Sequence, residues 1–229
     1  MKKQGFLTAF RDTVPVMTGY LFLGIGFGIV MYQNGYGAGW SFFMALFMYA
    51  GSAQYLTADL LVSGASLIST AVSIGLLNAR HLFYGISMLD TYRDAGKKKP
   101  YLIFALTDET YSLVTQNQPP EGISRLSYCF LVSLFDHIYW LVGCTLGGLL
   151  ATGLPIDLEG VDFVLTALFV TIFVEQWLSS RNHTSAIIGV VSTVLCLVIF
   201  GKDIFLIPSM ALIAIFLTVA KKTGRRAEP

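Results

Sequence analysis

Residues 14–32 read VPVMTGYLFLGIGFGIVMY, a run without a charged side chain. At about 1.5 Å per helical residue, this run crosses the roughly 30 Å hydrocarbon core of a bilayer. Further apolar runs follow at about 41–62, 66–89, 101–117, 126–152, 161–179, 184–200 and 204–220. The sequence therefore predicts an all-α fold, a polytopic transmembrane helical bundle of six to eight apolar segments.

The composition of the 229-residue chain agrees with this prediction. Hydrophobic residues make up 55% and charged residues 13%, which is too apolar for a soluble domain of this size. The formal net charge is +1, and the charges lie mostly between the apolar runs, so the pattern excludes a nucleic-acid-binding protein. Cys129, Cys144 and Cys196 have no paired spacing, which excludes a disulfide framework and a zinc ribbon. We expect neither a metal nor a cofactor.

Positive charge gathers at the N-terminus, in the loop 93–99, around Arg181 and in the tail 221–226. The positive-inside rule places all four in the cytoplasm, both termini included. An odd number of apolar runs separates the N-terminus from the loop, and the loop from the tail. Either one segment in each half is broken or re-entrant, or one loop breaks the charge rule. Segment 41–62 is the candidate in the first half, because Gly51-Ser52 interrupts it.

A weak internal repeat supports this arrangement. A shift of 122 residues aligns 54–56 with 176–178, which pairs segment 41–62 with 161–179 and the glycine-rich run 14–32 with 126–152. Segment 161–179 is therefore the candidate for the broken or re-entrant segment in the second half. Chance agreement among apolar residues is the alternative. If the repeat is real, the positive-inside rule places the two glycine-rich helices in opposite orientations, as in inverted-repeat transporters. It also predicts one transmembrane domain, 1–229, with repeat halves 1–122 and 123–220 and a cytoplasmic tail, 221–229.

Ionisable side chains inside apolar segments are the strongest functional signal, because each costs about 2.5 to 3.5 kcal/mol at a helix centre. Residues 78–84 read NARHLFY. Helical spacing puts Asn78 beside His81, and Arg80 beside Tyr84. Arg80 is a candidate for holding a carboxylate, and His81 for titrating near neutral pH. Alternatively, the segment ends early and Arg80 extends to the cytoplasmic interface.

Two adjacent carboxylates, Asp108 and Glu109, interrupt segment 101–117. Neighbouring helical positions point about 100° apart, so the two cannot face one partner at close range. One is expected to pair with Arg80 while the other takes up a proton. A purely structural ion pair is the alternative.

Three further groups are candidates. Asp136-His137 suggests a proton relay or structural hydrogen bonding, and Glu175-Gln176 a functional or an interfacial pair. Gly51, Ser52 and Gln54 lie among small residues, where a helix break exposes backbone N–H groups to a carboxylate, or where helices simply pack closely. We assign the glycines at 24, 26 and 28 to helix packing.

Four blocks stand in one order along nearly the whole chain, namely 11–15 (RDTVP), 49–54 (YAGSAQ), 78–85 (NARHLFYG) and 104–109 (FALTDE). Together they resemble the AzlC family, regarded as the large subunit of bacterial branched-chain amino-acid exporters. The resemblance implies a multi-pass inner-membrane protein with a small hydrophobic AzlD-type partner. It also implies export of valine, leucine and isoleucine, with methionine a further candidate, driven by an ion gradient.

The functional hypothesis is therefore a secondary exporter of small hydrophobic amino acids coupled to a proton gradient. The expected substrate-binding residues are Gly51, Ser52, Gln54, Asn78, Arg80 and Tyr84. The expected ion-coupling residues are His81, Asp108 and Glu109. An enzyme is disfavoured, because the chain has neither a Gly-x-Ser-x-Gly nor a His-Glu-x-x-His motif. A channel, or a subunit that needs a small partner for transport, remains the alternative.

Overall fold

The computed structural model describes residues 2–119, 121–153, 170, 173–174, 177–178, 183–201 and 205–224. Regular structure within these ranges is helical, with no strand, which confirms the all-α prediction. The chain divides into two compact units, residues 1–166 and 167–229.

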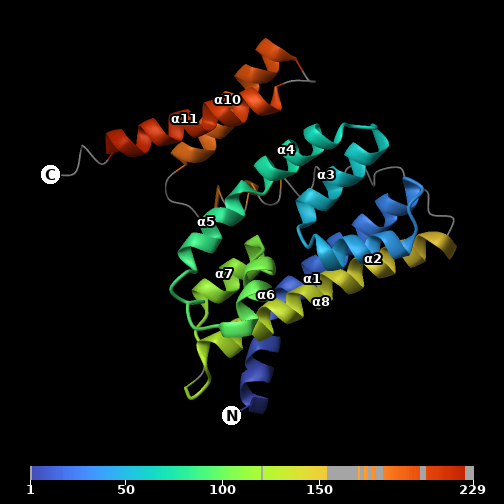
Figure 1. The fold of residues 1–229 in the computed structure, drawn as a ribbon, viewed down its shortest axis with the longest axis vertical. Helices are drawn as coiled ribbons and strands as arrows, with labels where there is room; N and C mark the ends of the chain where they lie inside the picture. Colours follow the sequence, from blue (N-terminus) through green and yellow to red (C-terminus); the bar gives the residue numbers. More distant parts are fainter. Residues whose placement is uncertain are drawn as a thin grey trace. The chain divides into compact units, whose positions relative to one another are not determined.

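The helices described in the first unit are α1 (Lys2–Gln33), α2 (Ala38–Phe47), α3 (Gly51–Val62), α4 (Leu67–Leu77), α5 (Ala79–Ser87), the 3-10 helix η1 (Gly96–Lys98), α6 (Lys99–Phe104), α7 (Asp108–Gln116) and α8 (Arg125–Gly153). Among the described helices, α1 and α8 are the two that are long and apolar enough to cross a bilayer. They lie side by side and form the axis of this unit (Figure 1).

Helices α1 and α8 run in the same direction. Tyr128, near the start of α8, bonds Asp12 of α1, and Gly147, near the end of α8, lies against Ile25. The predicted opposite orientation of these two helices is therefore wrong. That prediction counted 101–117 as a crossing segment before α8, but in the structure this segment is a hairpin, α6 and α7, that returns to the end at which it began.

Glycines bring the α1 and α8 backbones into contact, as the sequence suggested. A Cβ atom added at Gly24 would lie 2.9 Å from the Cys144 amide nitrogen, and one at Gly143 would lie 2.9 Å from the Tyr20 carbonyl oxygen. A Cβ at Gly28 would overlap the backbone around Gly148. Small residues on both faces allow this close approach, which is typical of helix pairs in membranes.

Helices α2 and α3 form a hairpin whose tip lies inside the unit. Helix α2 runs opposite to α8, since Ala38 lies against Gly148 and the Ala45 carbonyl oxygen is 3.2 Å from His137 Nε2. The helix breaks at residues 48–50, directly before the Gly51-Ser52 pair at which the sequence predicts an interruption.

Helix α3 then returns toward the end from which α2 came. Gly51 packs on the ring of Trp140, and further along α3 the Tyr55 hydroxyl donates to the Leu23 carbonyl while its ring contacts Phe27. Segment 41–62 is thus a hairpin of two short helices.

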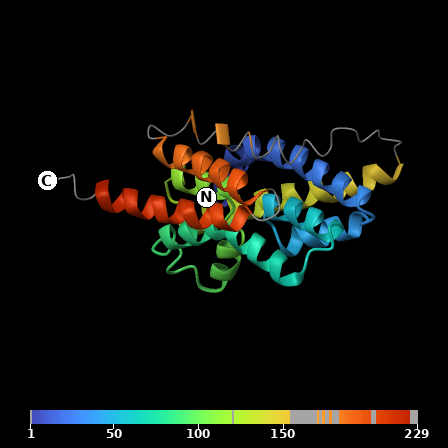
Figure 2. The ribbon, with the colours of Figure 1, turned by 90° about the horizontal axis from the view of Figure 1, so that it is seen from above.

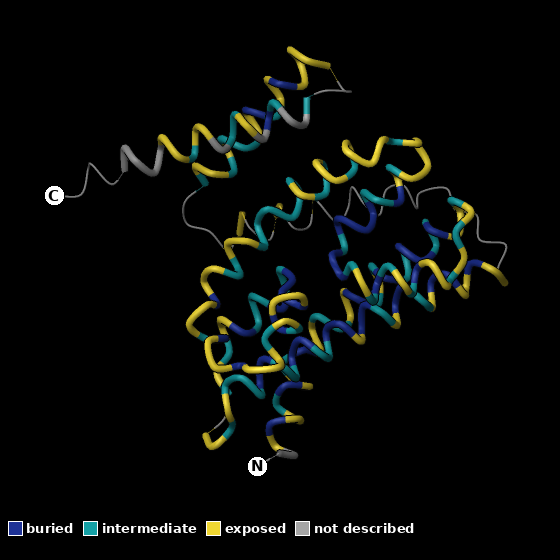
Figure 3. The backbone as a smooth tube through the Cα atoms, in the orientation of Figure 1, coloured by how far each residue is buried: buried dark blue, intermediate teal, exposed yellow. Residues whose placement is uncertain are grey.

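Helices α4 and α5 come next and are separated by one residue, Asn78. The sequence predicted a single helix over 66–89, and this continuity is wrong. Asn78 leaves the helical conformation, with φ −88° and ψ 0°, so α5 starts as a new helix. Neither helix has a buried residue, and both appear largely yellow and teal in Figure 3. Their outer faces are apolar, as lipid contact requires.

Helices α6 and α7 form a second hairpin, which enters from the opposite end. Helix α6 rises along α8, where Lys98 lies over the Phe130 ring and the Tyr101 hydroxyl is 3.2 Å from His137 Nδ1. Helix α7 descends again, because Thr110 bonds Asp136 while the later carbonyl of Val114 accepts from Arg125.

The predicted continuous helix over 101–117 is therefore wrong as well. It breaks at residues 105–107, where the Thr107 side chain accepts a hydrogen bond from the Thr110 amide and begins a new helix. Asp108 and Glu109 fall in its first turn, where the helix dipole favours negative charge.

The two hairpin tips meet near the middle of α1 and α8. Tyr49, at the first tip, has a left-handed backbone with φ 38°. Its ring stacks on His137 at 4.2 Å and lies 6.1 Å from Phe104 of α6. Two opposed hairpins thus face each other. The break in 101–117 was not predicted, and the segment predicted to be broken in the second half, 161–179, lies largely outside the described residues.

In the second unit, α10 (Thr184–Phe200) packs against α11 (Leu206–Gly224), and Figure 2 shows them side by side in orange and red. Gly201, with φ 72°, ends α10 and starts the connection. The described residues that are buried in this unit are Ser192, Cys196 and Ser209.

Candidate functional site

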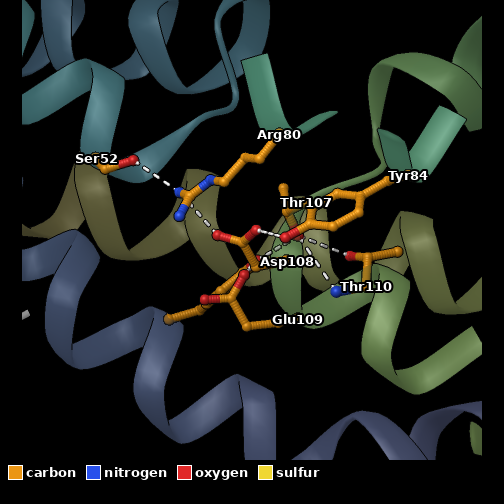
Figure 4. A network of polar contacts seen from close by, with 8 residues as sticks. Ser52, Arg80, Tyr84, Thr107, Asp108, Glu109 and Thr110 are labelled. Carbon is orange, nitrogen blue, oxygen red and sulfur yellow. Dashed lines mark hydrogen bonds and ion pairs between the residues drawn. The ribbon is translucent and has the colours of Figure 1, made fainter. Parts of the chain in front are cut away.

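Three of the interrupted helices begin around one arginine (Figure 4). Arg80 is the second residue of α5, Ser52 the second of α3, and Asp108 the first of α7. Arg80 Nη2 donates to Ser52 Oγ at 3.1 Å and forms an ion pair with Asp108 Oδ2 at 2.8 Å. The breaks in the three segments therefore bring these side chains together.

The Asp108 carboxylate is held on both oxygens. Its Oδ1 accepts a hydrogen bond of 2.6 Å from the Tyr84 hydroxyl, and its Oδ2 faces Arg80. The Tyr84 ring stacks on Tyr111 of α7 at 4.5 Å. The Arg80 and Asp108 side chains remain 28% and 24% exposed, so the pair is accessible from outside the packed core.

The arrangement attracts anions. Each α-helix start has backbone N–H groups without intrahelical partners and carries about half a positive charge. Helices α3, α5 and α7 have 12, 9 and 9 residues, and their starts surround a guanidinium whose charge one carboxylate balances. A carboxylate ligand suits such a site.

Glu109 points to a different partner from Asp108, as the sequence predicted for adjacent helical positions. Its Oε2 accepts a hydrogen bond of 2.7 Å from the Tyr20 hydroxyl of α1. Tyr20 also contacts Thr107 Oγ1 at 2.7 Å. The two acidic side chains thus connect α7 to α5 and to α1 respectively.

Two polar atoms beside the ion pair are buried and lack a hydrogen-bond partner within the described part of the chain, namely Arg80 Nε and Asn78 Oδ1. His81 lies next to them on α5, with its ring 5.8 Å from that of Tyr84. The Arg80 side chain is directed toward Ser52 and Asp108.

Gly51 and Gln54 face α8. Gly51 packs on the Trp140 ring, and Gln54 Oε1 accepts a hydrogen bond of 2.7 Å from Trp140 Nε1. Gln54 is fully buried, so its amide fixes α3 to α8. Among the expected site residues, the structure joins Ser52, Arg80, Tyr84 and Asp108 directly, with Asn78, His81 and Glu109 next to them.

Asp136 and His137 do not form a relay with each other. Asp136 Oδ2 accepts from Thr110 Oγ1 at 2.8 Å, whereas the His137 ring faces Tyr101 and the first hairpin tip. Glu175 and Gln176 lie outside the described residues.

Sequence reasoning missed Tyr20, Thr107 and Thr110. A helix-start pattern was present at Thr107, a hydroxyl residue directly before two carboxylates. Tyr20 gives no such signal, because a tyrosine in an apolar run resembles ordinary packing. Within the described residues, no group of three or more His, Cys, Asp or Glu side chains is placed to hold a metal ion.

Comparison with known proteins identifies relatives over most of the chain. Residues 15–154 match the AzlC protein family. "Branched-chain amino acid transport protein AzlC" of Bacillus subtilis (strain 168) is 41% identical over 97% of this chain and 88% of that protein. An uncharacterized membrane protein of Helicobacter pylori (strain ATCC 700392 / 26695) is 38% identical, over 95% of this chain and 97% of that relative.

A more distant relative, "Inner membrane protein YgaZ" of Escherichia coli (strain K12), is 24% identical over 82% of this chain and 81% of that protein. No solved structure matches the chain. The matched region contains all three helix starts of the site, and the resemblance inferred from the sequence is confirmed: the chain belongs to the AzlC family.

Proposed function

We propose that this protein is a secondary transporter that exports branched-chain and other small hydrophobic amino acids across the bacterial inner membrane in exchange for protons. The observation that carries the proposal is the accessible Arg80–Asp108 pair where three broken helices begin. The similarity to a Bacillus subtilis protein named for branched-chain amino acid transport supports the substrate class.

A free amino acid is a zwitterion, and the site offers a matching pair of charges. The substrate carboxylate would bind Arg80, whose Nε–H has no other partner within the described residues, and the N–H groups at the helix starts. The substrate ammonium would bind Asp108. Without substrate the two side chains neutralise each other, which limits the cost of keeping charges in an apolar bundle.

The proposed proton coupling uses the same carboxylate. A proton on Asp108 would compete with the substrate ammonium for this side chain, so substrate and proton would exclude each other at the site. Asp108, Glu109 and His81 are the groups proposed to take a proton from outside and release it inside. Binding of substrate and of proton thus favour different conformations, as an exchanger requires.

The two opposed hairpins suit alternating access. Broken helices whose ends meet at the midplane are the sites used by many secondary transporters. The tips at residues 48–50 and 105–107 touch through Tyr49 and Phe104. Separation of one tip at a time would open the site to one side only. We further propose cytoplasmic termini, six crossings and a small AzlD-type subunit.

The test uses proteoliposomes that hold the full chain, alone or with an AzlD-type subunit, loaded with radiolabelled valine. Saturable efflux stimulated by an inward proton gradient is expected, lost in Arg80→Ala and kept in Arg93→Ala. Arg93 is the matched control, because it pairs with Asp90 in an exposed loop. Non-saturable flux would indicate a channel instead. Absence of valine flux with and without the subunit would contradict the proposal.

A further inference from the structure

A row of hydroxyl groups connects Glu109, beside the Arg80–Asp108 pair, to Asp136 in the middle of α8. Tyr20 Oη lies 2.7 Å from Glu109 Oε2 and 2.7 Å from Thr107 Oγ1. Thr107 Oγ1 lies 3.1 Å from Thr110 Oγ1, which lies 2.8 Å from Asp136 Oδ2. Figure 4 shows the two threonines and Glu109 beside the ion pair.

The number of protons available for these hydrogen bonds indicates how many of the two carboxylates are ionised. Four oxygen–oxygen contacts join the five side chains, and each hydrogen bond needs one proton. The three hydroxyls supply three protons, because each carries a single O–H. With both carboxylates ionised, one contact has no proton and two oxygen lone pairs face each other. One added proton completes all four hydrogen bonds.

We infer that Glu109 and Asp136 share a single proton through Tyr20, Thr107 and Thr110, and that Asp136 is a proton-binding site. In one state Glu109 is protonated and donates to Tyr20, which donates to Thr107, Thr107 to Thr110, and Thr110 to ionised Asp136. In the other state every donor is reversed: Asp136 is protonated and Glu109 is ionised. The change moves one proton across each contact and needs no other reactant.

The surroundings of Asp136 support this assignment. The side chain is fully buried, and its Oδ1 has no hydrogen-bond partner in the described ranges. Asp136 also forms no ion pair with any described residue. Burial with one hydrogen-bond donor and no ion pair makes the charged form of a carboxylate costly.

The titratable groups around Asp136 come from every helix packed on it. Glu109 of α7 and Tyr20 of α1 belong to the row. Tyr49 at the first hairpin tip lies next to Thr110 and Tyr20 of the row, and both Tyr49 and Tyr101 of α6 lie near Asp136. His137 adjoins Asp136 along α8, but its ring nitrogens face Ala45 and Tyr101. Arg80 and Asp108 act electrostatically on Glu109 at the other end of the row, whereas the contacts of Asp136 named here include no Lys or Arg.

The use of this proton in transport rests on the proposed function. Glu109 is adjacent to Asp108, so a substrate that changes the charge at Arg80 and Asp108 changes the preference of Glu109 for the proton. The proton then moves toward or away from α8, through residues that also contact both hairpins. The row thus couples substrate binding at Arg80 and Asp108 to the charge of Asp136 in the middle of α8.

The shared proton is tested without any substrate. Infrared spectra of the purified protein at neutral pH should contain the carbonyl stretch of one protonated carboxyl group. This band should disappear in Asp136→Asn and remain in Asp90→Asn, a control in an exposed loop. Absence of the band from the wild type, or its persistence in Asp136→Asn, overturns the inference and leaves the proposed function standing.

The coupling is tested by transport. Tyr20→Phe and Thr110→Val cut the row and should abolish the stimulation of valine efflux by the proton gradient while valine exchange at equal pH continues. Tyr139→Phe is the matched control, because its hydroxyl contacts Thr13 outside the row. Full stimulation in both cut variants overturns the coupling. A wild type with the infrared band but no valine flux overturns the proposed function alone.

Discussion

Arg80 and Asp108 lie 2.8 Å apart, Nη2 to Oδ2, although they belong to different interrupted helices. Each lies within the first two residues of its helix, so the pair depends on two backbone breaks. Because both residues lie at helix starts, the Arg80 and Asp108 side chains can separate without the unwinding of a helical turn. This position agrees with the proposed role of the pair in binding substrate.

Replacement of Arg80 by lysine should weaken valine binding although the positive charge is kept. Arg80 contacts Ser52 and Asp108 from one nitrogen and has a further N–H donor, whereas lysine has one nitrogen and no planar fork. Loss of one charge-assisted hydrogen bond costs about 1.5 to 3 kcal/mol, so the KM for valine should rise roughly tenfold or more. Transport kinetics of Arg80→Lys and Arg93→Lys provide the measurement and its control. Equal KM values for Arg80→Lys and wild type would show that the planar guanidinium group of Arg80 has no role in valine binding.

The contact of α1 and α8 should be intolerant of a single methyl group. Gly147→Ala places a Cβ against the backbone of Ile25, and the helices must separate. We expect a loss of about 1 to 3 kcal/mol. Gly19→Ala, in α1 with no atom within 4 Å of the added Cβ, should be neutral or stabilising. Thermal unfolding in detergent compares the two, and equal midpoints would disprove the close contact.

The bond between Trp140 and Gln54 should fix α3 to α8. Trp140→Phe leaves Gln54 Oε1 buried without its donor at 2.7 Å and should cost about 1 to 3 kcal/mol. Adding Gln54→Leu removes the unpaired amide, so the double variant should lose less than the sum of the single variants. Denaturation of the four proteins measures the coupling. Strict additivity would indicate that the bond does not form.

The two hairpins and the parallel α1 and α8, together with the positive-inside rule, predict the side on which each loop lies. The α3–α4 loop should lie outside and the 93–99 loop inside, so Ser63→Cys should react with an impermeant thiol reagent in intact cells and Lys97→Cys only after lysis. Both positions are exposed, and the native cysteines are buried. Reaction of both variants in intact cells would contradict this topology.

The sequence was most informative where a charged side chain lies within an apolar segment. Arg80, Asp108 and Glu109 stand out because charged groups in apolar runs need a partner, and the structure pairs each of them. Hydropathy does not detect a break inside an apolar run, so the interruptions at Asn78 and 105–107 were missed. Yet these breaks assemble the site.

Long-range partners were equally hidden. Tyr20 reaches Glu109 across 89 positions of sequence, and no local pattern identifies such a pair. The direction of α8 relative to α1 depends on whether segment 101–117 crosses or turns back, and hydropathy does not determine this. The charged residues of the site were therefore predictable from sequence, whereas the residues that hydrogen-bond to them from other helices were not.

The most direct test of the account is calorimetric titration of the purified protein with three ligands: valine, valinamide, which lacks the carboxylate, and 3-methylbutanoate, which lacks the ammonium group. If Arg80 and Asp108 bind the two charges of an amino acid, valine should be the only one of the three ligands that binds. Arg80→Ala should abolish this binding, and Arg93→Ala should keep it. Binding of valinamide or 3-methylbutanoate as tight as that of valine, or unchanged valine binding to Arg80→Ala, would contradict the central claim.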